Sequence, residues 1–207
     1  MGSAQAVPVR KGSDVEALAR LQAQIHQRWD VKTGADPDNR IDHTIVDSTI
    51  AELITFPPPT LLVPTSPRMS PVETTIYRLT AKLVGYKIES DGDYHCIISD
   101  DQQQTLITEI PDPATLDPGT VFRDEITAAR TAFTARFALQ LKALAAASTL
   151  LGHVALGINA AIEPPMISHV NVPVIVIGLG FFDFAHNATG AARNCVECHP
   201  VLSIEFP

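Results

Sequence analysis

Residues 73–89, "ETTIYRLTAKLVGYKIE", constrain the fold more than any other part of the chain. Up to Leu83 every second residue is apolar, which is the pattern of a strand with one buried face. At Gly85 the pattern changes phase, and the apolar positions continue at Tyr86 and Ile88. A change of phase at a glycine indicates a bulge or a sharp coil. The segment therefore predicts one long strand that is bent at its glycine.

The remaining elements of the predicted core follow in a recognisable order. The turn "SDGDY" leads into strands over 94–99 and 104–110, and a helix with one apolar face spans 120–147. "VPVIVIGLGFFDF" is apolar on both faces, as in a buried central strand, and "HPVLSIEF" forms the last strand. This β-β-β-α-β-β order predicts a mainly β fold with helices (α+β). It is the order of a five-stranded barrel like the oligonucleotide/oligosaccharide-binding (OB) fold, with a helix between strands three and four.

The first third of the chain differs from this core in composition. Prolines exclude a helix or a central strand over part of it, and a helical spacing of apolar residues precedes them. We expect an N-terminal arm over 1–72 and a core domain over 73–207. The arm would comprise a helix over 13–29, a short helix over 48–55 and a Pro-rich linker over 57–71.

Composition narrows the classes of partner. The 207-residue chain has a formal net charge of −8, and its 15 Lys and Arg residues are scattered, so nucleic acid is an unlikely partner. A small molecule, a saccharide or a peptide fits better. The apolar run 143–162 is rich in alanine and interrupted by His153 and Asn159, so no transmembrane span is expected there.

One group of candidate site residues lies around the turn after the long strand. Asp91, Asp93 and His95 are spaced at i, i+2 and i+4, which places them on one face of an extended chain. Two carboxylates and an imidazole on one face suit a divalent cation. An ordinary turn, in which Asp91 bonds to its own backbone, explains the same aspartate. Glu109, on the strand that follows that of His95, could share this side; otherwise it is a solvated strand position.

A second group lies near the end of the chain. Asp183 and His186 follow the buried strand, where a loop commonly carries functional groups. Glu197 and His199 alternate on the last strand, and with His186 they would form a set of two histidines and one carboxylate. A loop cap at Asp183 and an exposed His186 are the structural alternatives.

Cys195-Val196-Glu197-Cys198-His199 has the C-x-x-C-H spacing of a c-type haem attachment site. Such motifs normally adjoin a helix, whereas this one leads directly into a strand. A haem bound through Cys195, Cys198 and His199 is therefore a minor hypothesis. A disulfide, a metal site that uses both thiols, or two ordinary thiols are the alternatives.

Several stretches resemble a family of bacterial exported proteins for which no activity is known to us. The resemblance covers "VKTGADPD", "PVETTIYRLTAKLVGYKIESDGDYHCIISD", "TLITEIPDP" and the closing "GFFDFAHNATGAARNCVECHPVLSIEF", about half of the chain. Family members typically read "DxDYHLVI", "TMIxEIPDP" and "FFDFxHGQTGxAPNxIELHPVL". The resemblance implies that nine residues belong to the family pattern: Asp91, Asp93, His95, Glu109, Asp183, His186, Asn194, Glu197 and His199.

The chain departs from this family pattern at Asn187-Ala188, Arg193, Cys195 and Cys198. Because the family has no cysteines there, the resemblance weakens the haem hypothesis. It also implies export, so we expect a periplasmic or secreted protein. Met1-Gly2-Ser3 looks like a cloning remnant, which predicts that a natural signal peptide was removed ahead of it.

Two functions from different classes follow from these patterns. In the first, the chain is an exported binding or structural barrel protein whose polar cluster connects loops to strands. In the second, it is a divalent-metal-dependent hydrolase in which His95, His186 and His199, with Asp91, hold one ion. The candidates for catalytic carboxylates are then Asp93, Glu109, Asp183 and Glu197.

Overall fold

The computed structural model describes residues 27–37, 40–144, 146, 167–185 and 188–207. Most of the predicted helix over 13–29 and most of the apolar run 143–162 lie outside the described residues. No helix among the described residues is long and apolar enough to cross a bilayer.

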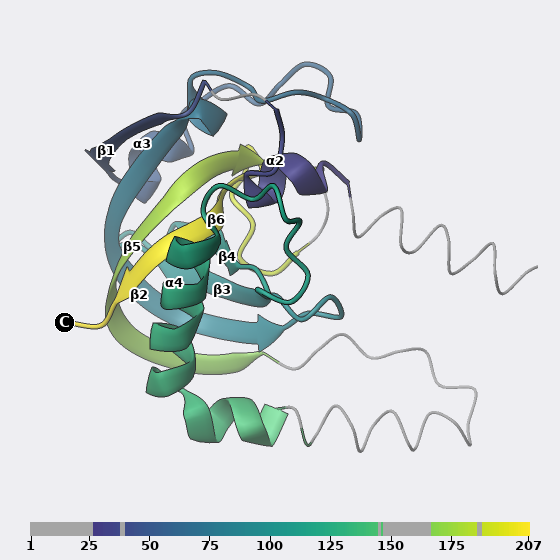
Figure 1. Cartoon of the computed structure of the whole chain (residues 1–207). Coiled ribbons are helices and arrows are strands. Elements are labelled where there is room, and N and C mark those ends of the chain that lie inside the picture. Colours follow the sequence, from purple (N-terminus) through teal and green to yellow (C-terminus); the bar gives the residue numbers. More distant parts are fainter. Residues whose placement is uncertain (1–26, 38–39, 145, 147–166, 186–187) are drawn as a thin grey trace, which may run out of the picture.

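Six strands form one mixed sheet that closes on itself (Figure 1). Their order is β1-β2-β3-β4-β6-β5, and an additional pairing of β2 with β5 completes the ring. β1 is parallel to β2 and β4 is parallel to β6, whereas the other pairs are antiparallel. The α+β class is thus confirmed. The strands are β1 Asp42–Ser48, β2 Thr75–Ile88, β3 Tyr94–Ser99, β4 Thr105–Ile110, β5 Ser168–Phe182 and β6 Val196–Glu205.

The long strand bends where the sequence predicts it. β2 shifts register between Leu83 and Gly85 against both of its antiparallel neighbours, β3 and β5. A Cβ added at Gly85 would lie 3.0 Å from Ile167 Cγ2, so the glycine also permits a close approach of the chain before β5. The bulge lets one strand contribute to two sides of the ring.

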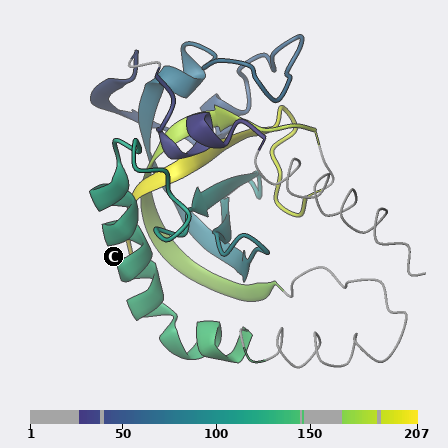
Figure 2. The same cartoon turned by 45° about the vertical axis from the view of Figure 1, so that its right-hand side comes forward.

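The predicted helix between β4 and β5 is present but ends early. α4 spans Arg123–Arg136, and a turn at Phe137 separates it from a further helical segment over 138–144. α4 lies along the outside of the ring beside β6 (Figure 2). Phe133 and Phe137 pack against Tyr86, with ring centroids 5.2 and 4.9 Å from the tyrosine ring. These contacts extend the main hydrophobic core from the ring to the helix.

β1 is a strand in the N-terminal arm for which only helices and a linker were predicted. Every residue of this strand is exposed or half-exposed, so its sequence carries no alternation of polar and apolar positions. The short helix itself is α3, Ile50–Leu53, and its N-cap is Thr49, which forms a capping box with Glu52. The Pro-rich stretch contains no helix or strand up to a 3₁₀ turn, η1, over Val72–Thr74.

The segment before the long strand is fastened to the ring by a buried ion pair. Arg28 precedes α2, Trp29–Thr33, and its Nη1 and Nη2 lie 2.8 and 2.5 Å from the two carboxylate oxygens of Glu73. Arg28 Nη1 also donates to the carbonyl of Phe182, the last residue of β5. The predicted division at residues 72/73 stays a prediction, and these contacts place α2 at the end of the ring where β5 ends.

Candidate functional site

Three neighbouring strands bring the polar residues of the core together. His95 on β3 pairs directly with Glu109 on β4, and β4 runs parallel to β6 next to Glu197 and His199. Asp93 lies just before β3. All five residues are buried: their exposed fractions range from 1% for His199 to 7% for Glu109. Sequence positions up to 106 residues apart along the chain thus meet at one end of the ring.

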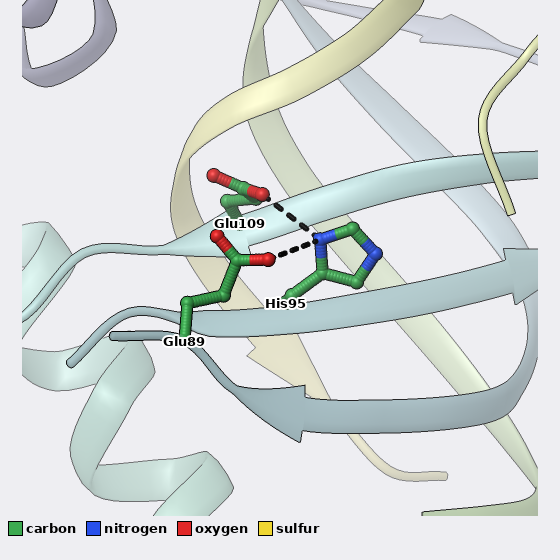
Figure 3. Close-up of side chains that lie close together, drawn as sticks. All are labelled: Glu89, His95 and Glu109. Atoms are coloured by element: carbon green, nitrogen blue, oxygen red, sulfur yellow. Dashed lines mark hydrogen bonds and ion pairs between the residues drawn. The ribbon is translucent and has the colours of Figure 1, made fainter. Parts of the chain in front are cut away.

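Glu109 is the centre of the cluster. Its Oε1 lies 3.0 Å from Nδ1 of His95, and its Oε2 lies 3.0 Å from Nδ1 of His199. Glu89 is the first residue after β2. Its Oε1 lies 3.4 Å from the same His95 nitrogen. Figure 3 shows both carboxylates on the Nδ1 side of the His95 ring. One carboxylate therefore faces two imidazoles, one through each oxygen.

The backbone fixes the orientation of His95. Its Nε2 lies 3.3 Å from the carbonyl oxygen of Thr189, which can only accept a hydrogen bond. Nε2 must then carry a proton, and Nδ1 faces the two carboxylates. This second-nitrogen bond to a carbonyl is the usual way in which a protein orients a metal-binding histidine.

Several buried polar atoms in the cluster have no hydrogen-bond partner. They are both ring nitrogens of His199, Oε1 of Glu197 and Oδ2 of Asp93. His199 Nδ1 nevertheless makes ion-pair contacts with Glu109 Oε2 at 3.0 Å and with Glu197 Oε1 at 3.7 Å, so the ring has charged neighbours on its Nδ1 side. Buried polar groups are nearly always paired, so atoms without a hydrogen-bond partner mark a place where a ligand could bind.

The cluster opens into a pocket of about 510 Å³ at this end of the ring. Its walls come from α2, from the turn between β2 and β3 and from the chain after β5, and they include Lys32, Asp91 and Asp183. Lys32 Nζ lies 3.8 Å from Asp183 Oδ2 and is 5.3 Å from the centre of the Phe181 ring. Glu109 and His199 form the floor, so a small molecule in the pocket reaches the buried cluster.

Burial and mutual charge shift the protonation of the cluster. Desolvation raises the pKa of Asp93 to about 7, and desolvation together with the nearby Asp183 raises the pKa of Glu197 to about 7. Burial opposes a charge on His199, but the carboxylates of Glu109 and Glu197 outweigh it and raise its pKa to about 9. Burial also disfavours ionised Glu109, yet His199 and His95 hold its pKa well below the usual value.

These shifts predict a stability that decreases with pH in chelator-treated protein. Asp93 and Glu197 have ordinary pKa values of 3.8 and 4.5, so the native state retains protons that the unfolded chain loses. Their contribution is present at low pH and is lost as pH rises through about 7, and that of His199 is lost through about 9. Each group changes the free energy of unfolding by up to ~1.4 kcal/mol per pH unit.

Urea unfolding at pH values between about 5 and 9 measures this trend. The midpoint should fall with rising pH, and an Asp93→Asn variant should fall less steeply below pH ~7. A urea midpoint that rises from about pH 5 to about pH 9 would show that ionisation of Asp93 and Glu197 does not destabilise the folded protein.

The structure separates the predicted metal ligands into two sets. His95 and His199 both converge on Glu109, but one candidate group is Glu89, His95 and Glu109, and the other is Asp93, Glu109 and His199. Asp91 belongs to neither group among the described residues. Its Oδ1 accepts a hydrogen bond from the backbone N–H of Asp93, 3.1 Å away, as the turn alternative predicts.

The other predicted site residues have different positions. His186 lies outside the described residues, so the predicted set of three histidines stays a prediction. Asp183 lies in the pocket wall, where its backbone N–H donates to Cys195 and its side chain accepts from the N–H of Phe184. It is therefore near the cluster without being part of either candidate metal group among the described residues.

The C-x-x-C-H segment does not form the arrangement that haem attachment needs. Cys195 and Cys198 are free thiols, so the disulfide alternative is not formed. Cys198 is fully buried within the main hydrophobic core, and burial raises its pKa to about 12. His199 next to it faces the polar cluster instead. A haem on both thiols would have to displace core side chains.

Two residues of the site were not expected from the sequence. Glu89 extends the alternating series Asp91, Asp93 and His95 backwards by one step, so the same i, i+2 rule could have found it. Lys32 lies in a polar segment that has no chemical motif, and only the fold places it in the pocket. Neighbouring Glu109, Glu197, Asp183 and Glu89 overcome the effect of burial and raise the pKa of Lys32 above its usual value.

Comparison with models of protein families, with curated proteins and with solved structures gave no match. What can be concluded about function therefore rests on the chain's own geometry and chemistry.

Proposed function

We propose that the chain is a divalent-metal-dependent hydrolase whose ion is bound by Asp93, Glu109 and His199. The observation that carries this proposal lies at the pocket floor: His199 is 1% exposed, its Nε2 has no hydrogen-bond partner, and its Nδ1 lies beside the carboxylates of Glu109 and Glu197. Asp93 Oδ2 beside it is also unpaired. A divalent ion that displaces the proton of His199 would accept a lone pair from each residue and satisfy both at once.

The spacing of the donor atoms suits an ion of ordinary size. Asp93, Glu109 and His199 offer ligand atoms that all lie within 4.8 Å of one another. Ion-to-ligand bonds of about 2.0–2.2 Å put neighbouring ligands roughly 3.3–3.6 Å apart, so only a small contraction is needed. Three protein ligands would leave room for a water or a substrate on the ion, as in catalytic rather than structural sites, and Glu109 and His199 line the pocket.

The residues around the pocket can support hydrolysis of a small ester. A bound divalent ion polarises a phosphoryl or acyl oxygen and lowers the pKa of bound water towards ~7. Glu197, whose pKa is raised to about 7, lies within 3.7 Å of His199 and could accept the proton of that water as general base. Lys32 in the pocket wall provides a positive charge for an anionic substrate.

We also propose an OB-like fold, an extracytoplasmic location and a small substrate for this protein. The ring β2-β3-β4-β6-β5, with β4 parallel to β6 and α4 between β4 and β5, supports an OB-like five-stranded barrel to which β1 adds an edge strand. The resemblance to bacterial exported proteins supports an extracytoplasmic location. The formal net charge of −8 supports a small substrate rather than a long nucleic acid.

A binding protein without a metal ion is the second candidate. It is favoured by His95, both of whose nitrogens have partners, and by Lys32, whose charge partly compensates the surrounding carboxylates. In this case the pocket would bind a small molecule, a saccharide or a peptide, and the cluster would connect strands through hydrogen bonds and ion pairs.

Hydrolysis assays distinguish the two candidates. Protein treated with chelator is assayed with p-nitrophenyl acetate, p-nitrophenyl phosphate and bis(p-nitrophenyl) phosphate, before and after addition of Mn²⁺, Zn²⁺ or Ca²⁺. The metal-dependent hydrolase should act on at least one ester only after metal is restored, and His199→Ala should be inactive. His169→Ala, which removes an exposed histidine on β5, should remain active. No metal-dependent turnover of any ester would favour the binding protein.

A further inference from the structure

We infer that Glu109 bridges two divalent ions, one on each of its carboxylate oxygens, and that the substrate is a phosphoester. This inference rests on the proposed function and adds a second ion held by Glu89, His95 and Glu109. The two candidate ligand groups share no residue except Glu109.

The carboxylate of Glu109 is oriented for bridging. Oε1 faces His95 and Oε2 faces His199, each at 3.0 Å from the Nδ1 atom. In Figure 3 the second oxygen of Glu109 points away from His95. A carboxylate that bound a single ion through both oxygens would instead turn both towards the same imidazole.

The His95 half of the site has the features of a prepared ligand set. The bond from Nε2 to the carbonyl of Thr189 fixes the ring so that Nδ1 faces Glu89 and Glu109 at 3.4 and 3.0 Å. These separations match those of ligands around a common ion with bonds of about 2.0–2.2 Å. The carbonyl behind the ring orients the imidazole in the way usual for metal ligands.

The His199 half supplies the independent sign of a missing ligand. His199 is almost fully buried and its Nε2 has no hydrogen-bond partner, and Oδ2 of Asp93 has none either. Two lysines face this end of the ring: Lys32 Nζ lies 3.8 Å from Asp183, and Lys87 Nζ lies 2.7 Å from Glu89 Oε1, a contact that an ion there would have to replace. Six carboxylates surround the pocket and its floor: Glu89, Asp91, Asp93, Glu109, Asp183 and Glu197. Two divalent ions would balance such a cluster better than one.

Two ions about 3.5–4 Å apart are the arrangement that stabilises both the attacking and the leaving oxygen of an in-line displacement at phosphorus. The oxygen of a water, after its proton passes to a carboxylate such as Glu197, forms the new bond to phosphorus. The bond from phosphorus to the ester oxygen breaks, and the leaving alkoxide takes up one proton. One water and one phosphoester thus give one alcohol and one phosphate with one ester bond fewer.

Titration with Mn²⁺ alone tests the bridge, followed by equilibrium dialysis and electron paramagnetic resonance. Wild-type protein should bind two ions per chain and show the signal of an exchange-coupled pair. His95→Ala and His199→Ala should each bind one uncoupled ion, and the exposed-site control His169→Ala should bind two. Circular dichroism and thermal unfolding of every variant show whether it has folded.

The outcomes separate this inference from the proposed function. One ion per wild-type chain, or two ions without coupling, would overturn the bridge and leave the single-ion hydrolase standing. No bound ion would overturn both. Metal-dependent cleavage of p-nitrophenyl acetate without cleavage of either phosphate ester would overturn the substrate class.

Discussion

Glu109→Gln is expected to abolish binding of divalent metal and to lower metal-dependent hydrolysis about 100-fold or more, since even residues behind the ligands cost 10–100-fold. The substitution keeps the size of the side chain. It removes the negative charge that faces His95, His199 and Lys32, and it replaces one ligand oxygen by an amide NH₂ group that cannot bind a metal. No other residue contacts both imidazoles in the described cluster.

The matched control is Glu125→Gln, which removes a carboxylate from the exposed surface of α4. It should leave metal binding and the rate of hydrolysis unchanged. Dialysis against Mn²⁺ and the ester assays measure both variants. Wild-type metal affinity and activity in folded Glu109→Gln would contradict a role for this cluster as the metal site.

Arg28→Ala should destabilise the protein by about 3–5 kcal/mol, because it removes one partner of a buried ion pair and leaves the other uncompensated. Glu73 is 0% exposed, and besides Arg28 it accepts hydrogen bonds from the N–H groups of Phe182 and Met69. Arg28 in turn donates to the carbonyls of Ser66, Pro67 and Phe182. The pair thus joins three separate segments of the chain.

Urea unfolding of this variant is compared with that of Arg78→Ala. Arg78 pairs with Asp47 on the surface at 2.9 Å, with its side chain 41% exposed, and such pairs contribute only about 0–1 kcal/mol. If Arg28→Ala lost no more stability than Arg78→Ala, the Arg28–Glu73 pair would not fasten α2 to the ring.

The sequence was sufficient to predict the elements whose patterns are strong and local. The phase change at Gly85 predicted the bend in β2. The turn sequence "SDGDY" predicted the hairpin that β2 forms with β3. The helix of α4 was found from its buried face, although its end at Arg136 was not, because apolar residues continue beyond Phe137. β1 was missed since its exposed residues give no signal of a buried face.

The sequence pointed to several residues that lie together in the structure, but it missed Glu89 and Lys32 and did not give their arrangement. The candidates Asp93, His95, Glu109, Glu197 and His199 all lie in one cluster. That Glu109 lies between the two histidines depends on the register of β3 against β4 and on the parallel pairing of β4 with β6. Such long-range pairing is set by the whole fold, and no local spacing encodes it.

The central claim is tested most directly by anomalous X-ray scattering from crystals of the chain soaked in Mn²⁺, with data collected on both sides of the manganese absorption edge. The account predicts an anomalous peak between Asp93, Glu109 and His199, within bonding distance of all three side chains. The proposed bridge adds a second peak beside Glu89 and His95. An ordered pocket with no peak at this cluster, in crystals where Mn²⁺ has reached it, would contradict the metal site.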